Sequence, residues 1–245
     1  MIFLILIAGF WAGLQNALAG GGSFITLPAL ILSGMSPLAA NITSTVALFP
    51  GQVTSGVAGR RLVTGIGKLP FWVLFLVSVL GGGLGGLLLL ETPSTLFARL
   101  VPWLVLFATS VFAWGSFFRK SAKGQRQIGP VSAAIAQFCI AIYGGYFGGG
   151  IGFLMMAALT MAGLPTRDAG ATKNALAGVM NAAAVALFVA SPEVHWTEAL
   201  VLGGGAIVGG LGGAWALYRV NERVLRLVIV GIGIALTFGL FLRPV

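Results

Sequence analysis

Long apolar runs dominate this sequence and limit what it can fold into. Six of them are long enough to cross the hydrocarbon core of a bilayer, which is about 30 Å thick and needs about 20 apolar residues per helix. These runs cover residues 42–59, 69–90, 97–117, 171–190, 199–218 and 224–242. Only 8% of the residues are charged, against about 25% in a soluble domain. We therefore expect an all-α integral membrane protein.

Two further apolar regions are each too long for one helix. Residues 2–34 are interrupted by Gly20-Gly21-Gly22, and residues 131–163 by Gly148-Gly149-Gly150. Each region is expected to form a broken helix or a re-entrant hairpin, which gives a bundle of about 8 to 10 transmembrane or re-entrant segments. Ala17-Leu18-Ala19 resembles the cleavage site of a signal peptide, but no basic leader precedes it, so we interpret this segment as mature structure.

Landmarks of the first half return in the second half at a nearly constant spacing. The triplet that begins at Gly20 returns at Gly148, and a GGLGG stretch that begins at Gly82 returns at Gly209. Several landmarks in the same order indicate a duplication. The predicted organisation is a first repeat over 1–118, a basic linker over 119–130 and a second repeat over 131–245.

The basic residues predict how the two repeats face the membrane, because Lys and Arg accumulate in cytoplasmic loops. The basic loop at 60–68 corresponds to the acidic loop at 191–198, and the loop at Glu91 corresponds to the basic loop at 219–223. Equivalent loops then lie on opposite sides, so we predict an inverted-topology repeat, an arrangement common in secondary transporters. This topology also accounts for the net charge of +9 without a nucleic-acid partner. The linker 119–130 is expected to be cytoplasmic.

The two glycine triplets are candidate substrate-binding elements. Inverted-repeat transporters bind substrate near the midplane, where the N-termini of broken helices can hold anions. Glycines leave their backbone N–H groups accessible to such a ligand. The candidates are Gly20, Gly21, Gly22 and Ser23, together with Gly148, Gly149 and Gly150. The alternative is that these glycines only allow close helix packing, which is the role we assign to the two GGLGG stretches.

A second group of candidates is polar and lies at the start of two predicted spans. Its members are Asn41, Thr43 and Ser44 in the first repeat and Thr172, Lys173 and Asn174 in the second. Capping of the helix N-termini is one interpretation, but it does not explain an ammonium group inside an apolar run, which is costly and usually functional or paired. Lys173 would suit an anionic substrate; alternatively it snorkels to the surface beside Arg167 or pairs with Asp168. Weaker polar candidates are Gln15, Asn16, Gln52 and Asn181.

The sequence contains no pattern typical of an enzyme or a metal site. His195 is the only histidine and Cys139 the only cysteine, and the five acidic residues lie at the ends of the spans. A metal cluster or a catalytic triad needs several such groups together. We therefore expect no catalytic residue, no metal and no cofactor, and an intramembrane enzyme is disfavoured.

Four motifs together resemble the sulfite exporter TauE/SafE family. They are GGGSFITLP at 20–28, ANITST at 40–45, GGGIG at 148–152 and ATKN at 171–174, and the resemblance extends over nearly the whole chain. It implies a permease of the bacterial inner membrane, with proposed substrates that include sulfite, sulfoacetate and other small organosulfur or carboxylate anions.

The function expected from the sequence is transport of a small anion, such as sulfite or an organosulfonate, by alternating access. The competing hypothesis is a membrane scaffold or accessory subunit that transports nothing and uses its glycines only for packing. The expected partners are a small anionic substrate and the lipid bilayer. A proton or a sodium ion is a candidate coupling ion, and a second copy of the chain is a candidate subunit.

Overall fold

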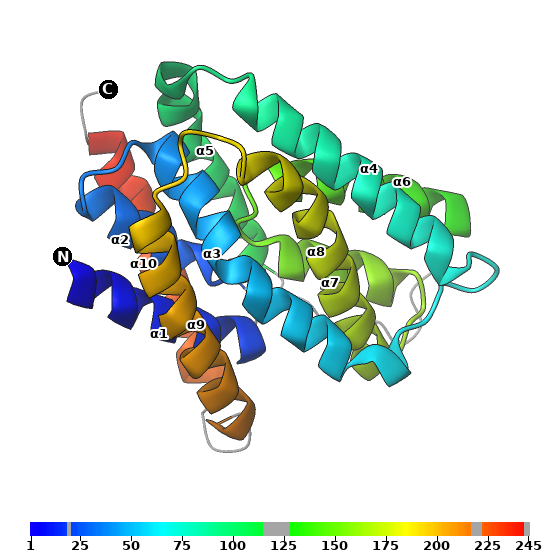
Figure 1. The fold of residues 1–245 in the computed structure, drawn as a ribbon. Helices are drawn as coiled ribbons and strands as arrows, with labels where there is room; N and C mark the ends of the chain where they lie inside the picture. The colour runs from blue at the N-terminus through cyan, green and yellow to red at the C-terminus, as the bar shows by residue number, and fades with distance from the viewer. Residues whose placement is uncertain (19–20, 115–127, 217–221, 243–245) are drawn as a thin grey trace.

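The computed structural model describes residues 1–18, 21–114, 128–216 and 222–242 as a bundle of helices (Figure 1). The described elements are α1 (Ile2–Leu18), α2 (Ser23–Leu32), α3 (Pro37–Ala58), the short 3₁₀ helix η1 (Arg60–Leu62), α4 (Phe71–Leu90), α5 (Ser94–Ala113), α6 (Pro130–Tyr146), α7 (Ile151–Met161), α8 (Thr166–Phe188), α9 (Trp196–Ala216) and α10 (Glu222–Leu242). No strand occurs in these ranges, so the prediction of an all-α chain is confirmed. Gly20, residues 119–127 of the predicted linker and residues 219–221 of a predicted basic loop lie outside the described ranges.

The first glycine triplet separates α1 from α2, and α2 folds back onto α1. The side chain of Asn16 accepts a hydrogen bond of 2.7 Å from the backbone N–H of Gly22. A Cβ atom on Gly22 would lie only 2.8 Å from the carbonyl oxygen of Ala12, so a larger residue could not make this close return. Residues 2–34 were expected to form a broken helix or a hairpin. The structure shows two helices that fold back on each other as a hairpin.

The second triplet produces an equivalent hairpin from α6 and α7. Its two ends meet where the N–H of Ile128 donates to the carbonyl of Met161 at 3.1 Å. The returning helices α2 and α7 have 10 and 11 residues, which corresponds to about 15 and 17 Å and therefore to about half of the hydrocarbon core. The returning arm of each hairpin is therefore too short to cross the core, whereas α1 and α6, with 17 residues each, reach the lower limit for a span.

Helices α3 and α8 cross each other at the centre of the bundle and run in opposite directions. A Cβ atom on Gly56 would lie 3.4 Å from the Cα atom of Ala175, and one on Gly59 would lie 3.3 Å from the Cβ atom of Ala171. Residue numbers therefore rise along α3 as they fall along α8. Small residues at this crossing let the two backbones approach closely.

The start of α3 corrects the capping interpretation of the polar cluster. Ser36 caps the helix, because its Oγ accepts a 3.1 Å hydrogen bond from the N–H of Ala39, and Pro37 supplies the first helical residue. Both choices are favourable at a helix N-terminus. Thr43 and Thr172 therefore lie inside α3 and α8 rather than at their ends.

The helices of the two halves pack in an exchanged pattern. Helix α1 of the first half packs along α9 of the second half, and α6 of the second half packs along α4 of the first half. Likewise α3 contacts α9 and α8 contacts α4, while α5 pairs with α10. Figure 1 shows α4 beside α6, and α1 beside α9, on opposite flanks of the central α3–α8 pair. The contact of α1 with α9 thus matches that of α6 with α4, and the contact of α3 with α9 matches that of α8 with α4.

Glycines make the closest of these contacts. A Cβ atom on Gly82 would collide with the carbonyl oxygen of Met180, and one on Gly209 with that of Phe10. The packing role predicted for the two GGLGG stretches is therefore confirmed at these positions. In lipid, where helices gain little from apolar burial, such close backbone contact is a main source of association.

The outside of the bundle is apolar. Among the described residues, Phe71–Leu90 and Ser94–Val111 are long and apolar enough to cross a membrane, and other apolar helices are shorter. The predicted spans 42–59, 171–190, 199–218 and 224–242 coincide with α3, α8, α9 and α10. Trp72, Trp114 and Trp196 are exposed at helix ends, as expected for residues at a membrane interface.

Candidate functional site

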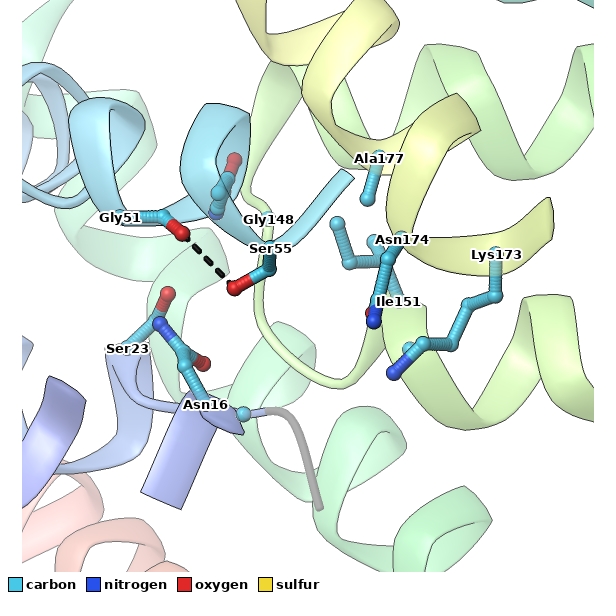
Figure 2. Close-up of a pocket in the computed structure, with 12 residues that line it drawn as sticks. Asn16, Ser23, Gly51, Ser55, Gly148, Ile151, Lys173, Asn174 and Ala177 are labelled. Atoms are coloured by element: carbon cyan, nitrogen blue, oxygen red, sulfur yellow. Dashed lines mark hydrogen bonds between the residues drawn. The ribbon is translucent and has the colours of Figure 1, made fainter. Parts of the chain in front are cut away.

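A small cavity lies where the two hairpin turns meet the central helices. Its volume is about 50 Å³, which is room for about four water molecules and therefore for one small polyatomic ion. The lining residues come from α1, the two turns, α2, α3, α7 and α8 (Figure 2). They are Asn16, Gly21, Ser23, Gly51, Gln52, Ser55, Gly148, Ile151, Gly152, Lys173, Asn174 and Ala177.

Two helices begin at the wall of this cavity. Ser23 is the first residue of α2 and Ile151 the first residue of α7, and both line the cavity. The turns before them use backbone conformations that favour glycine, with φ of +85° at Gly21, +79° at Gly148 and +74° at Gly150. The N–H groups of Phe24 and Phe153 already donate to the carbonyls of Gly21 and Gly150, but the first turn of a helix still carries partial positive charge. The cavity is therefore suited to an anion.

Lys173 supplies a full positive charge to the same cavity. It lies on α8, and Figure 2 shows its side chain extending toward the other lining residues. Within the described residues it forms no salt bridge, since the ion pair found there joins His195 to Glu198. The alternative pairing with Asp168 is therefore not present. None of the twelve lining residues is acidic, so no carboxylate offsets this ammonium group.

The structure brings together five of the residues predicted to bind substrate. Gly21, Ser23, Gly148, Lys173 and Asn174 all line the cavity, although they come from distant parts of the chain. Asn16 and Gln52, which the sequence singled out only as polar residues in apolar surroundings, line it as well.

Ser55 also lines the cavity and was missed. It lies three residues after Gln52 and four after Gly51, so these residues share one face of a helix. A small or polar residue at each of these positions inside an apolar run was the signal that could have identified Ser55.

Other predicted residues lie outside the cavity and hold helices together. The Nδ2 atom of Asn41 donates to the carbonyl of Tyr146 at 3.1 Å, and the hydroxyls of Ser44 and Thr26 are 2.5 Å apart. The carbonyl of Gly149 accepts a hydrogen bond of 2.9 Å from the hydroxyl of Tyr143. The first two contacts hold the hairpins against α3, and the third lies within the second hairpin.

Thr43 and Thr172 have equivalent structural roles. The Oγ1 atom of Thr172 accepts from the N–H of Thr64 at 3.2 Å and lies 3.4 Å from its carbonyl. The Oγ1 atom of Thr43 accepts from the N–H of His195 at 3.1 Å and lies 3.4 Å from the carbonyl of Glu193. Each threonine therefore fastens a loop of the other half of the chain.

The chain is similar in sequence to several proteins that are named as probable membrane transporters. The chain is 26% identical to a probable membrane transporter protein of Haemophilus influenzae over 94% of its own length and 90% of the relative. It is 28% identical to the probable membrane transporter protein ORF9 of Sinorhizobium over 100% of its length and 94% of the relative. For the probable membrane transporter protein YfcA of Escherichia coli the identity is 27%, over 94% and 84%. No solved structure matches the chain.

These relatives are named as membrane transporters and not as enzymes, and the apolar helical bundle agrees with a protein that spans the membrane. The model of one transporter family matches residues 5–240, a range that includes both hairpins and all of the cavity. The chain therefore belongs to the sulfite exporter TauE/SafE family.

Proposed function

We propose that the protein is a permease for small anions, such as sulfite or an organosulfonate, and that the cavity beside Lys173 is its substrate site. The observation that carries this proposal is the meeting of one ammonium group with the N-termini of α2 and α7 in a cavity without carboxylates. The family description, sulfite exporter, supports an oxyanion as the substrate.

The polar groups around the cavity suit a sulfite or sulfonate group. Its oxygen atoms would accept hydrogen bonds from the Lys173 ammonium, the Asn174 amide and the Ser23 hydroxyl. Charge-assisted hydrogen bonds of this kind are roughly twice as strong as neutral ones, and they offset the cost of removing an anion from water. A volume of about 50 Å³ favours a substrate of few heavy atoms.

The two halves are proposed to be inverted relative to each other, with the loop that carries Arg60, Arg61 and Lys68 on the cytoplasmic side of the inner membrane. The antiparallel crossing of α3 and α8 and the exchanged helix contacts support this arrangement. The basic loop supports the orientation, since Lys and Arg accumulate on the cytoplasmic side.

Transport is proposed to occur by alternating access. In the register that matches Thr43 to Thr172, Ser44 is the counterpart of Lys173, but it is only 2% exposed and is hydrogen-bonded to Thr26. The position equivalent to Lys173 is therefore buried and uncharged. A second cavity of about 510 Å³, lined by Leu38 and Ile42, lies near the other end of α3. If the two halves of the chain exchanged conformations, the substrate cavity would close and the substrate would face the opposite side of the membrane.

Flux measurements in proteoliposomes test the proposal. The wild-type protein is expected to give saturable sulfite flux, and Lys173→Gln is expected to abolish it. The matched control is Lys68→Gln, which removes the same charge from an exposed loop residue and should leave flux unchanged. Absence of flux for sulfite, sulfoacetate and other small anions, with protein shown to be folded, would favour the non-transporting scaffold instead.

A further inference from the structure

An apolar groove runs along the outside of the α3–α8 crossing and shares only Gln52 with the lining of the substrate cavity. Its volume is about 600 Å³. The lining residues are Gln52, Val53, Gly56, Val57, Arg60, Val63, Phe71, Phe75, Ala175, Gly178, Val179 and Ala182. Arg60 is the only charged residue among them, and Gln52 is the only other one with a polar side chain. We call this feature the α3–α8 groove.

The groove exists because two of the residues at the helix crossing are glycines, which have no side chain. Gly56 and Gly178 lie at the crossing of the two helices, and a Cβ atom on Gly178 would lie 3.7 Å from the carbonyl of Gln52. The valines beside the furrow remain open, with exposed fractions of 40% for Val53 and 53% for Val57. A furrow with this apolar lining favours an apolar occupant.

The two ends of the groove differ in polarity. Arg60 follows directly after α3 and lies in the basic loop with Arg61 and Lys68. Trp72, with an exposed fraction of 68%, directly follows the lining residue Phe71 and indicates the level of the membrane interface. From Arg60 to Gln52 the groove extends for about eight residues of chain, or about 12 Å along a helix. The charge thus lies at the interface and the apolar lining extends into the bilayer.

We propose that the α3–α8 groove is a binding site for an anionic phospholipid. The phosphate binds the guanidinium of Arg60, and one acyl chain lies along Val53, Val57 and Phe75. Arginine is well suited to phosphate because its planar fork can make two parallel hydrogen bonds. Anionic lipids are also concentrated in the cytoplasmic leaflet, the side to which we assign this loop.

Charge distinguishes a lipid from a second copy of the chain as the occupant. A twofold interface buries the same patch of both subunits, so it would place two copies of the Arg60 loop near each other, with repulsion between like charges. In the same register of the two halves, the position equivalent to Arg60 is Val189, and the loop after it carries Glu193 and Glu198. Residues 189–195 of that loop contain no lysine or arginine that could bind a lipid phosphate.

Native mass spectrometry of the purified full-length protein tests this site without any transport substrate. After delipidation, the protein is titrated with phosphatidylglycerol or with phosphatidylcholine of the same acyl chains, and preference for phosphatidylglycerol is expected. Arg60→Gln should weaken phosphatidylglycerol binding about fivefold, the value of one interfacial cation, and leave phosphatidylcholine binding unchanged. The matched control is Arg99→Gln, an exposed arginine in the first turns of α5, which should bind as the wild type does.

A second variant tests the apolar part of the site. Val57→Trp fills the groove and keeps Arg60, so it should reduce the binding of both lipids while the protein elutes as the same folded species. Equal binding of phosphatidylglycerol by wild type and Arg60→Gln would overturn the proposal. Unchanged lipid binding by Val57→Trp, together with conversion of a dimer into a monomer, would also overturn it and would identify the groove as an interface between copies.

Discussion

Asn181 Nδ2 donates a hydrogen bond to Gln52 Oε1, and the predicted repeat, in the register that matches Thr43 to Thr172, pairs the same two residues. The bond joins α3 to α8, the two equivalent helices that cross at the centre of the bundle. Asn181 is only 3% exposed, so its amide depends on this partner. The centre of the molecule is therefore held by a polar contact between the two halves of the chain.

Removal of either partner should destabilise the protein. Gln52→Leu or Asn181→Leu leaves the other amide without its partner, at a cost of about 1–2 kcal/mol in the free energy of unfolding. The double variant should cost less than the sum of the two, with a coupling of about 0.6 kcal/mol or more, as for other hydrogen bonds between membrane helices. Unfolding in mixed micelles measures these values. Additive effects would show that the two side chains do not stabilise each other.

The contact between Thr26 and Ser44 should control whether α2 can separate from α3 during transport. Thr26→Cys and Ser44→Cys, combined in a Cys139→Ala background, place two thiols where the hydroxyls are 2.5 Å apart. Oxidation should join α2 to α3 and stop transport, and a reductant should restore it. Each single cysteine variant is the control and should be insensitive to oxidant. Full transport by the crosslinked protein would show that α2 and α3 need not separate there.

Labelling with a membrane-impermeant maleimide should reveal opposite orientations for equivalent loops. In intact cells that carry the Cys139→Ala variant, Glu91→Cys and Glu193→Cys should react. Lys68→Cys should react only after the membrane is permeabilised, because the basic loop is expected inside. Labelling of all three positions in intact cells would contradict the inverted topology, and labelling of Lys68→Cys alone would reverse the orientation.

Two glycines of one stretch should respond differently to the same substitution. A Cβ atom on Gly85 would collide with the carbonyl oxygen of Ile142, whereas one on Gly83 meets no atom within 4 Å. Gly85→Ala should therefore destabilise the protein by about 1–3 kcal/mol through overpacking. Gly83→Ala should be neutral or stabilising by up to about 1 kcal/mol, because alanine is the better helix former. Thermal unfolding of the two variants in one detergent compares them directly.

Features that depend on neighbouring residues were predictable from the sequence. Apolar length identified the helices, and the two triplets identified the hairpin turns, because a return such as the one at Gly22 leaves no space for a side chain. The convergence of both turns with Lys173 also followed, since duplicated landmarks suggest equivalent places in one bundle.

Features that depend on distant partners were not predictable in this way. Thr43 and Lys173 both lie in polar stretches near the starts of apolar runs, yet Thr43 binds the loop at Glu193 while Lys173 lines the cavity. The difference arises from the face of the helix on which each residue lies and from a partner 150 positions away in the case of Thr43. Neither the helix face of a residue nor its distant partner can be read from the local pattern of polar and apolar residues.

The exchanged helix contacts also determine how the protein can assemble during synthesis. Gly9 and Gly13 of α1 lie directly against the carbonyls of Leu202 and Ala206 of α9, so the surface that receives α1 is synthesised about 190 residues after it. The opening hairpin must therefore wait in the bilayer or beside the insertion machinery until most of the polypeptide has been translated. A nascent chain that stalls before α9 leaves α1 in contact only with nearby helices such as α2 and α3, so the glycine face of α1 stays uncovered.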